Sequence, residues 1–213
     1  MFPLRDTQPS YSKPVVTVLL IVINVLVFLF EISLDPYTRN EFIATYGLVP
    51  DQFTFLTVLT SMFLHGGWFH ILSNMWVLYI FGDNIEDRMG GGRYLVFYLL
   101  SGVAAALLES FVLRGSSVPM IGASGAIAGV LGAYLILYPR ARIASLVPIL
   151  FIFTIIEIPA LLFLLFWFVS QLFSGWLTLQ GSNGSGIAWW AHVGGFVFGM
   201  TAVNLFTQRR LRY

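Results

Sequence analysis

The chain has 213 residues, of which 58% are hydrophobic and 10% are charged, with a mean hydropathy of +0.84 and a net charge of +1. Soluble domains usually carry about 25% charged residues, so this composition predicts a membrane protein. The small net charge and the lack of a basic patch with interleaved aromatics argue against a nucleic-acid partner. Without cysteine, the chain offers no thiolate nucleophile and no cysteine ligand for a metal.

The first expected membrane span covers about residues 14–33 and ends at the Asp35-Pro36 turn. Its length, and the lack of a small-residue cleavage site before Glu31, favour an uncleaved helix over a signal peptide. The following segment, 34–60, mixes aromatic and charged residues. Because amphipathic rings favour headgroup depth, this pattern predicts a loop at the outer membrane–water interface.

The second, third, fourth and sixth expected spans are bounded by polar or glycine-rich breaks. The second covers about 64–82 and is closed by a polar stretch that reaches Arg88. The third covers about 94–113 after a run of three glycines, and the fourth covers about 121–138. The last expected span, about 188–206, follows a loop rich in glycine and serine. Each segment is close to the ~20 apolar residues that cross a bilayer as a helix.

Segment 143–175 is apolar almost throughout but contains Pro148, Glu157 and Pro159. It could form two spans, or one span preceded by an interfacial or re-entrant stretch. We favour the second arrangement, because a glutamate is costly in mid-bilayer and proline is tolerated at a helix start. The fifth span then covers about 159–178.

Basic residues indicate the orientation of these six spans. With the N-terminus inside, nine of the eleven Lys and Arg residues fall on the inner side, and only Arg39 and Arg114 fall outside. This distribution follows the positive-inside rule, whereas a seventh span would move the C-terminal arginines outside. We therefore expect a single all-α membrane domain over residues 1–213, a bundle of six transmembrane helices with both termini on the cytoplasmic side.

Polar side chains inside the expected spans predict a functional site, because such groups are costly in lipid. His70 and Asn74 are four residues apart and face one side of the second span. Ser124 opens the fourth span between glycines, and His192 lies near the start of the sixth. These three spans run in the same direction in the six-span topology. Ser124, His70 and His192 are therefore expected at similar depth in the outer part of the membrane, with Asn74 one helical turn deeper than His70.

Small residues provide a way to bring Ser124 and His192 together. The fourth span carries Gly125 and Gly129, and the sixth carries the pair Gly195 and Gly199. Glycines at this spacing let membrane helices approach closely. If the two faces meet, the serine and the histidine come within hydrogen-bonding reach.

These residue types predict serine-protease chemistry. A serine hydroxyl becomes a good nucleophile when a neutral imidazole such as that of His192 takes its proton. The amide of Asn74 and an N–H of His70 are suitable donors to the oxyanion that forms. No Asp or Glu lies at outer depth in the second, fourth or sixth span, so we expect a dyad rather than a triad.

The sequence resembles the rhomboid family of intramembrane proteases in four motifs that run in the family's order. The matching motifs are His65-x4-His70-x3-Asn74, Glu86-x-Arg88, Gly122-x-Ser124-Gly125 and Ala191-His192-x-x-Gly195-x-x-x-Gly199. The resemblance implies a six-helix core that cleaves single-span membrane proteins near their outer end. It implies Ser124 as nucleophile, His192 as general base, and His70 and Asn74 at the oxyanion site, with no cofactor and no metal.

The same resemblance gives further residues a role. His65 is implied to be mainly structural, and Glu86 with Arg88 to hold the loop after the second span. The fifth span and the loop after it, roughly 159–187, are implied to control access of the substrate. Two family features are missing. Ala128 stands where some members have a tyrosine stacked on the catalytic histidine, and segment 34–60 has no Trp-Arg pair.

Other functions remain open on the sequence alone. A metalloprotease is a weaker reading, because His65 and His70 do not share a helix face and no H-E-x-x-H motif is present. A transporter would use the same buried polar groups as a path. A catalytically inactive relative that binds client helices is the third possibility. A bacterial cytoplasmic membrane is the expected location.

Overall fold

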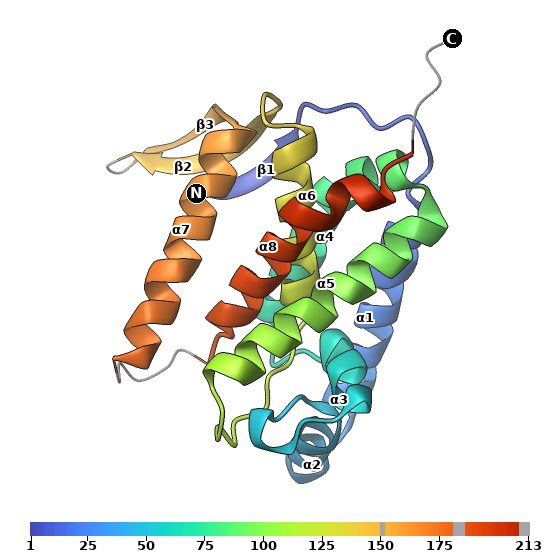
Figure 1. The fold of residues 1–213 in the computed structure, drawn as a ribbon, viewed down its shortest axis with the longest axis vertical. Coiled ribbons are helices and arrows are strands. Elements are labelled where there is room, and N and C mark those ends of the chain that lie inside the picture. Colours follow the sequence, from blue (N-terminus) through green and yellow to red (C-terminus); the bar gives the residue numbers. More distant parts are fainter. Residues whose placement is uncertain (150–151, 181–185, 209–213) are drawn as a thin grey trace.

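The computed structural model describes residues 1–149, 152–180 and 186–208. Most of them are helical, and three strands form a small sheet at one end of the bundle (Figure 1). In chain order the elements are β1 (Phe2–Asp6), α1 (Val15–Ser33), α2 (Pro36–Tyr46), η1 (Pro50–Gln52), α3 (Phe55–Thr60), η2 (Ser61–Phe63), α4 (Trp68–Met89), α5 (Gly91–Val112), α6 (Ser124–Leu137), β2 (Arg142–Ile149), β3 (Ile152–Pro159), α7 (Ala160–Leu179) and α8 (Trp189–Phe206).

A helix corresponds to each of the six expected spans, namely α1, α4, α5, α6, α7 and α8. Within the described ranges, three of them (α1, α5 and α7) are by themselves long and apolar enough to cross a membrane. A fourth candidate arises if α4 is counted together with the segment Phe55–Phe63, which meets it at a bend of 90°.

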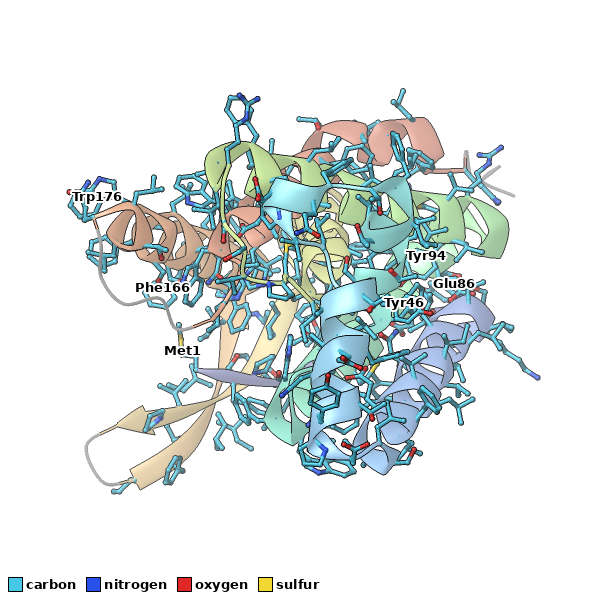
Figure 2. The ribbon with its side chains drawn as sticks, turned by 90° about the horizontal axis from the view of Figure 1, so that it is seen from below. Met1, Tyr46, Glu86, Tyr94, Phe166 and Trp176 are labelled. Atoms are coloured by element: carbon cyan, nitrogen blue, oxygen red, sulfur yellow. The ribbon has the colours of Figure 1, made fainter. Side chains whose placement is uncertain are left out.

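The centre of the bundle is α6, in which every residue from Gly125 to Leu135 is buried. A helix that is apolar on all sides is suited to such a position. By contrast, α1 and α7 expose many large apolar side chains. In Figure 2, Phe166 and Trp176 lie on the outer side of α7, where they are 64% and 52% exposed. Such surfaces are suited to contact with lipid.

The backbones of α6 and α8 touch through glycines, as the sequence predicted. A Cβ atom on Gly195 would overlap the carbonyl oxygen of Gly125, and one on Gly199 would overlap that of Gly129. The contact therefore leaves no room for a methyl group on these positions of α8. It brings the first turns of α6 and α8 to the same level of the bundle.

The expectation of an entirely helical chain is wrong in the stretch 143–158, although its described residues form no second helix and so fit the favoured arrangement of one span in this region. This stretch forms β2 and β3, which pair antiparallel from Arg142 opposite Pro159 to Ile149 opposite Ile152. The run is rich in β-branched residues, which favour strands. Pro148 lies beyond the part of β2 that β1 covers, so its missing N–H costs no ladder bond on that side. The hairpin projects away from the helices (Figure 2).

The N-terminal residues complete the sheet. β1 pairs with β2, with Phe2 opposite Leu146. The Trp76 indole donates to the carbonyl of Pro3 at 2.7 Å, and the hydroxyl of Tyr134 donates to Asp6. The strand therefore joins the sheet to both α4 and α6.

The polar stretch after the second expected span is helical instead of a loop. α4 continues to Met89 and ends at Gly90, whose φ of +76° favours glycine. The carboxylate of Glu86 accepts hydrogen bonds from the N–H groups of Val16 and Thr17 at 2.9 and 2.8 Å. Glu86 therefore satisfies orphan donors at the start of α1, and Figure 2 shows it on the side of α4 that faces α1.

Segment 34–60 is also more ordered than the expected loop. α2 begins with Asp35 as N-cap, whose carboxylate accepts from Tyr37 and Thr38, and with Pro36 at the first helical position. Together with α3 it lies at the end of the bundle opposite the sheet (Figure 1).

Candidate active site

A cavity of about 350 Å³ lies where α6 and α8 begin, and it contains all four candidate residues. Ser124, His192, His70 and Asn74 line it together with Phe69, Ser73, Ile121 and residues 186–188. The structure therefore brings together residues that are up to 122 positions apart in the chain. Such a pocket, lined by apolar groups and a few convergent polar ones, has the character of a ligand or active site.

Ser124 and His192 are within hydrogen-bonding distance. The Ser124 Oγ lies 2.8 Å from the Nε2 of His192. Ser124 is the first residue of α6 and is half-buried, whereas His192 lies in the first turn of α8 and is 9% exposed. The pairing follows from the glycine contacts described above, because they hold the starts of these two helices side by side.

The second ring nitrogen of His192 has a partner that sequence reasoning missed. Its Nδ1 lies 2.8 Å from the Oε1 of Gln171, a buried side chain of α7. In the sequence, this partner could have been found as the one amide side chain in the strongly apolar fifth span. Two tryptophan rings flank the imidazole: Trp167 at 5.8 Å with a tilt of 34°, and Trp189 edge-on at 6.1 Å. Ala128, four residues after Ser124, has no ring that could stack on His192. In the described residues, the aromatic neighbours of His192 are these two tryptophans.

His70 directs one ring nitrogen toward the serine segment. The N–H of Gly66 donates to its Nδ1 at 3.4 Å, so the ring hydrogen lies on Nε2. A Cβ on Gly122 would stand 2.7 Å from this Nε2, and Gly122 has a φ of +127°. The backbone just before Ser124 therefore requires glycine both for its conformation and for the approach of His70.

Asn74 is held by His65. The Nδ2 of Asn74 donates to the Nε2 of His65 at 3.1 Å and lies 3.7 Å from the position of a Cβ on Gly122. His65 precedes α4, is fully buried, and packs its ring edge-on against His70 at 5.0 Å. Its own N–H donates to the carboxylate of Glu31 at 3.1 Å. His65 thus acts as a support for both His70 and Asn74.

Glu109 supports the histidine side of the cavity and was also missed. This buried carboxylate of α5 accepts the N–H of Ala191 at 2.7 Å, directly before His192. A carboxylate at this place satisfies a free donor of the first turn of α8 and complements the helix dipole. An acidic residue near the outer end of the third expected span was the signal that could have found it. Over the described ranges, no cluster of three His, Cys, Asp or Glu residues could hold a metal ion.

Comparison with known proteins assigns the chain to a family. A model described as "Rhomboid domain" matches residues 52–209, which is well over half of the chain. The chain belongs to the rhomboid family. With several helices that can cross a bilayer by length and composition, this rhomboid is an integral membrane protein.

Curated relatives come from bacteria and from organelles. Rhomboid protease GluP of Bacillus subtilis (strain 168) is 37% identical over 129 residues, which cover 58% of this chain and 25% of that protein. The human Presenilin-associated rhomboid-like protein, mitochondrial, is 31% identical over 149 residues, covering 69% of this chain and 37% of the relative. Rhomboid-like protein 11, chloroplastic, of Arabidopsis thaliana is 32% identical over 114 residues, covering 50% of this chain and 39% of the relative. This rhomboid thus spans well under half the length of these relatives.

Proposed function

We propose that this rhomboid is an intramembrane serine endopeptidase with a Ser124–His192 dyad. The observation that carries the proposal is the 2.8 Å separation between Ser124 Oγ and His192 Nε2 inside a cavity shared with His70 and Asn74. Nucleophile and base within hydrogen-bond reach are the signature of an activated serine. A relative whose name includes the word protease adds support from outside the structure.

In the proposed reaction, Ser124 Oγ attacks the carbonyl carbon of a peptide bond while His192 Nε2 takes its proton. The tetrahedral intermediate then collapses, and His192 gives the proton to the departing amine. A water molecule, activated by the same nitrogen, hydrolyses the acyl-enzyme and regenerates the serine.

Three donors are suited to the negative charge on the carbonyl oxygen. Two are His70 Nε2–H and the second N–H of Asn74, which both lie against Gly122. The third is the backbone N–H of Ser124, which has no acceptor within α6 because it opens the helix. The dipole of α6 acts in the same sense, since its positive end is at this residue.

The proposal includes a membrane topology. Six helices cross the membrane, with both termini on the cytoplasmic side and the cavity in the outer half. The apolar surfaces of α1 and α7 then face lipid, and single-span membrane proteins are the substrates. A bacterial cytoplasmic membrane is the proposed location, and no nucleic acid, cofactor or metal takes part.

A gel assay in mild detergent tests the function. Purified protein is incubated with a generic single-span substrate beside the Ser124→Ala and His192→Ala variants. Cleavage by the wild type and by neither variant supports the dyad. Equal cleavage by all three would show another nucleophile or a contaminant. If no substrate is cut and a fluorophosphonate probe also fails to label the wild type, a transporter or an inactive client-binding protein becomes the better reading.

Replacing Asn74 by alanine is expected to slow cleavage without abolishing it. Removing one oxyanion donor usually costs about 10²–10³-fold in kcat, and two donors would remain. The measurement is kcat in detergent, with a melting curve as control because Asn74 also donates to His65. Full activity in a stable Asn74→Ala variant would remove Asn74 from the oxyanion site.

A further inference from the structure

Gln171 is the polar exception on an apolar helix. The face of α7 that packs inward carries Ala160, Phe163, Leu164, Gln171 and Gly175. Gln171 is 5% exposed, so its amide must find partners within the protein. It lies where α7 meets α8, one turn before Gly175, at which a Cβ atom would stand 3.1 Å from the Trp190 ring.

The hydrogen bonds of the amide fix which of its two ends faces His192. The Nε2 of Gln171 donates to the carbonyl oxygen of Trp167 at 3.2 Å and to the Oγ of Ser170 at 2.9 Å. The Ser170 hydroxyl itself donates to the Trp167 carbonyl, so its oxygen is free to accept. A reversed amide would place its oxygen against the Trp167 carbonyl, which can only accept. The Oε1 of Gln171 is therefore the atom that faces His192.

This orientation determines the tautomer of His192. The Oε1 of Gln171 can only accept, so the Nδ1 of His192, 2.8 Å away, must carry the ring hydrogen. In the neutral ring, Nε2 then has a free lone pair and accepts the hydroxyl of Ser124 at 2.8 Å. A general base needs this lone pair to take the serine proton.

We propose that Gln171 is a positioning residue that holds His192 in the Nδ1–H tautomer and so prepares Nε2 to act as base toward Ser124. The inference rests on the proposed function. Gln171 completes a chain of contacts from α7 through α8 to α6, in which its amide oxygen takes the place that a carboxylate has in a Ser-His-Asp triad. Trp167, four residues before Gln171, covers one side of the imidazole that the amide orients.

Two substitutions at this position separate positioning from packing. Gln171→Leu keeps the size and suits an apolar helix but removes the acceptor, whereas Gln171→Glu keeps an acceptor but adds a buried acid. If Gln171 only fills space, leucine is the better replacement and glutamate the worse. If it positions His192, the order of activity is reversed. Gln52→Leu, at the exposed end of η1 and outside the cavity, is the matched control.

Steady-state kinetics and the rate of fluorophosphonate labelling would be measured for all four proteins. For Gln171→Leu we expect kcat and the labelling rate to fall about 10–100-fold, the range typical of losing the hydrogen-bond partner that orients a metal-binding histidine, with KM unchanged. Gln171→Glu should keep more of both rates than the leucine variant, and Gln52→Leu should match the wild type.

The outcomes distinguish this inference from the function on which it rests. An active wild type with an equally active Gln171→Leu variant overturns the role of Gln171 and leaves the dyad intact. An active wild type in which leucine is better tolerated than glutamate overturns it too, in favour of packing. A wild type that neither cleaves nor labels, like Ser124→Ala, overturns the proposed function and the role of Gln171 with it.

Discussion

Replacing Ser124 by alanine is expected to lower the rate of peptide-bond cleavage by about 10⁴-fold or more, because loss of a serine nucleophile has an effect of this order. The fold should be unaffected. Ser124 is half-buried at the edge of a cavity, and the variant removes one hydroxyl without creating a clash. The measurements are cleavage of a single-span substrate, labelling by a fluorophosphonate, and the melting temperature in detergent.

Labelling and melting measurements on Ser124→Ala separate a catalytic role of Ser124 from a structural one. We expect no labelling and a melting temperature within a few degrees of the wild type, because the lost contact is one hydrogen bond worth about 0.5–1.5 kcal/mol. Labelling that persists in this variant would place the reactive serine elsewhere. A strongly lowered melting temperature would mean that Ser124 serves the packing of α6 against α8 instead of chemistry.

Gly195→Ala is expected to damage stability and activity together. A Cβ on this residue overlaps the carbonyl oxygen of Gly125, and backbone atoms cannot turn aside as a side chain can. The helices α6 and α8 must therefore part, at a cost of about 1–3 kcal/mol for overpacking. Parting them lengthens the 2.8 Å contact between Ser124 and His192. A misplacement of ~1 Å at such a site costs about 10²-fold in rate.

The matched control for this substitution is Gly92→Ala. Gly92 is also helical, in the first turn of α5, but a Cβ there meets nothing within 4 Å. Alanine at an open helical position usually stabilises by about 0.5–1 kcal/mol relative to glycine, so Gly92→Ala should melt at or above the wild-type temperature with full activity. Melting curves and kcat/KM of both variants test the pair. Wild-type behaviour of Gly195→Ala would show that the two helices do not touch at this point.

The differences between expectation and structure have a common physical origin. The stretch 143–158 reads as apolar in any window, and a window cannot distinguish a buried helix from a hairpin. The structure shows a hairpin in which β2 pairs with β3 along its whole length, and β1 adds a third strand whose Phe2 lies opposite Leu146, 144 positions away. In the same way, the polar stretch 82–88 reads as a loop. It is helical because Glu86 reaches the start of α1.

The candidate site likewise combines features that follow from local sequence with features that depend on how the helices pack. His70 and Asn74 share a helix face because they are four residues apart, which is local geometry. The contact between Gln171 and His192 depends on how α7 is rotated against α8, and the bond from Ala191 to Glu109 on how α5 lies beside α8. Neither rotation is encoded in the spacing of residues along one helix.

The sequence by itself determined that the protein belongs in a membrane, roughly where the six helices of the bundle lie along the chain, and which serine, histidines and asparagine to consider. These conclusions depend on the length of apolar runs, on charge and on spacing, which are properties of the chain read locally. Only the tertiary structure decided the three-stranded sheet, the helical course of 82–88, and the partners of His192. Those features arise from contacts between distant segments, and their geometry exists only once the helices have packed against one another.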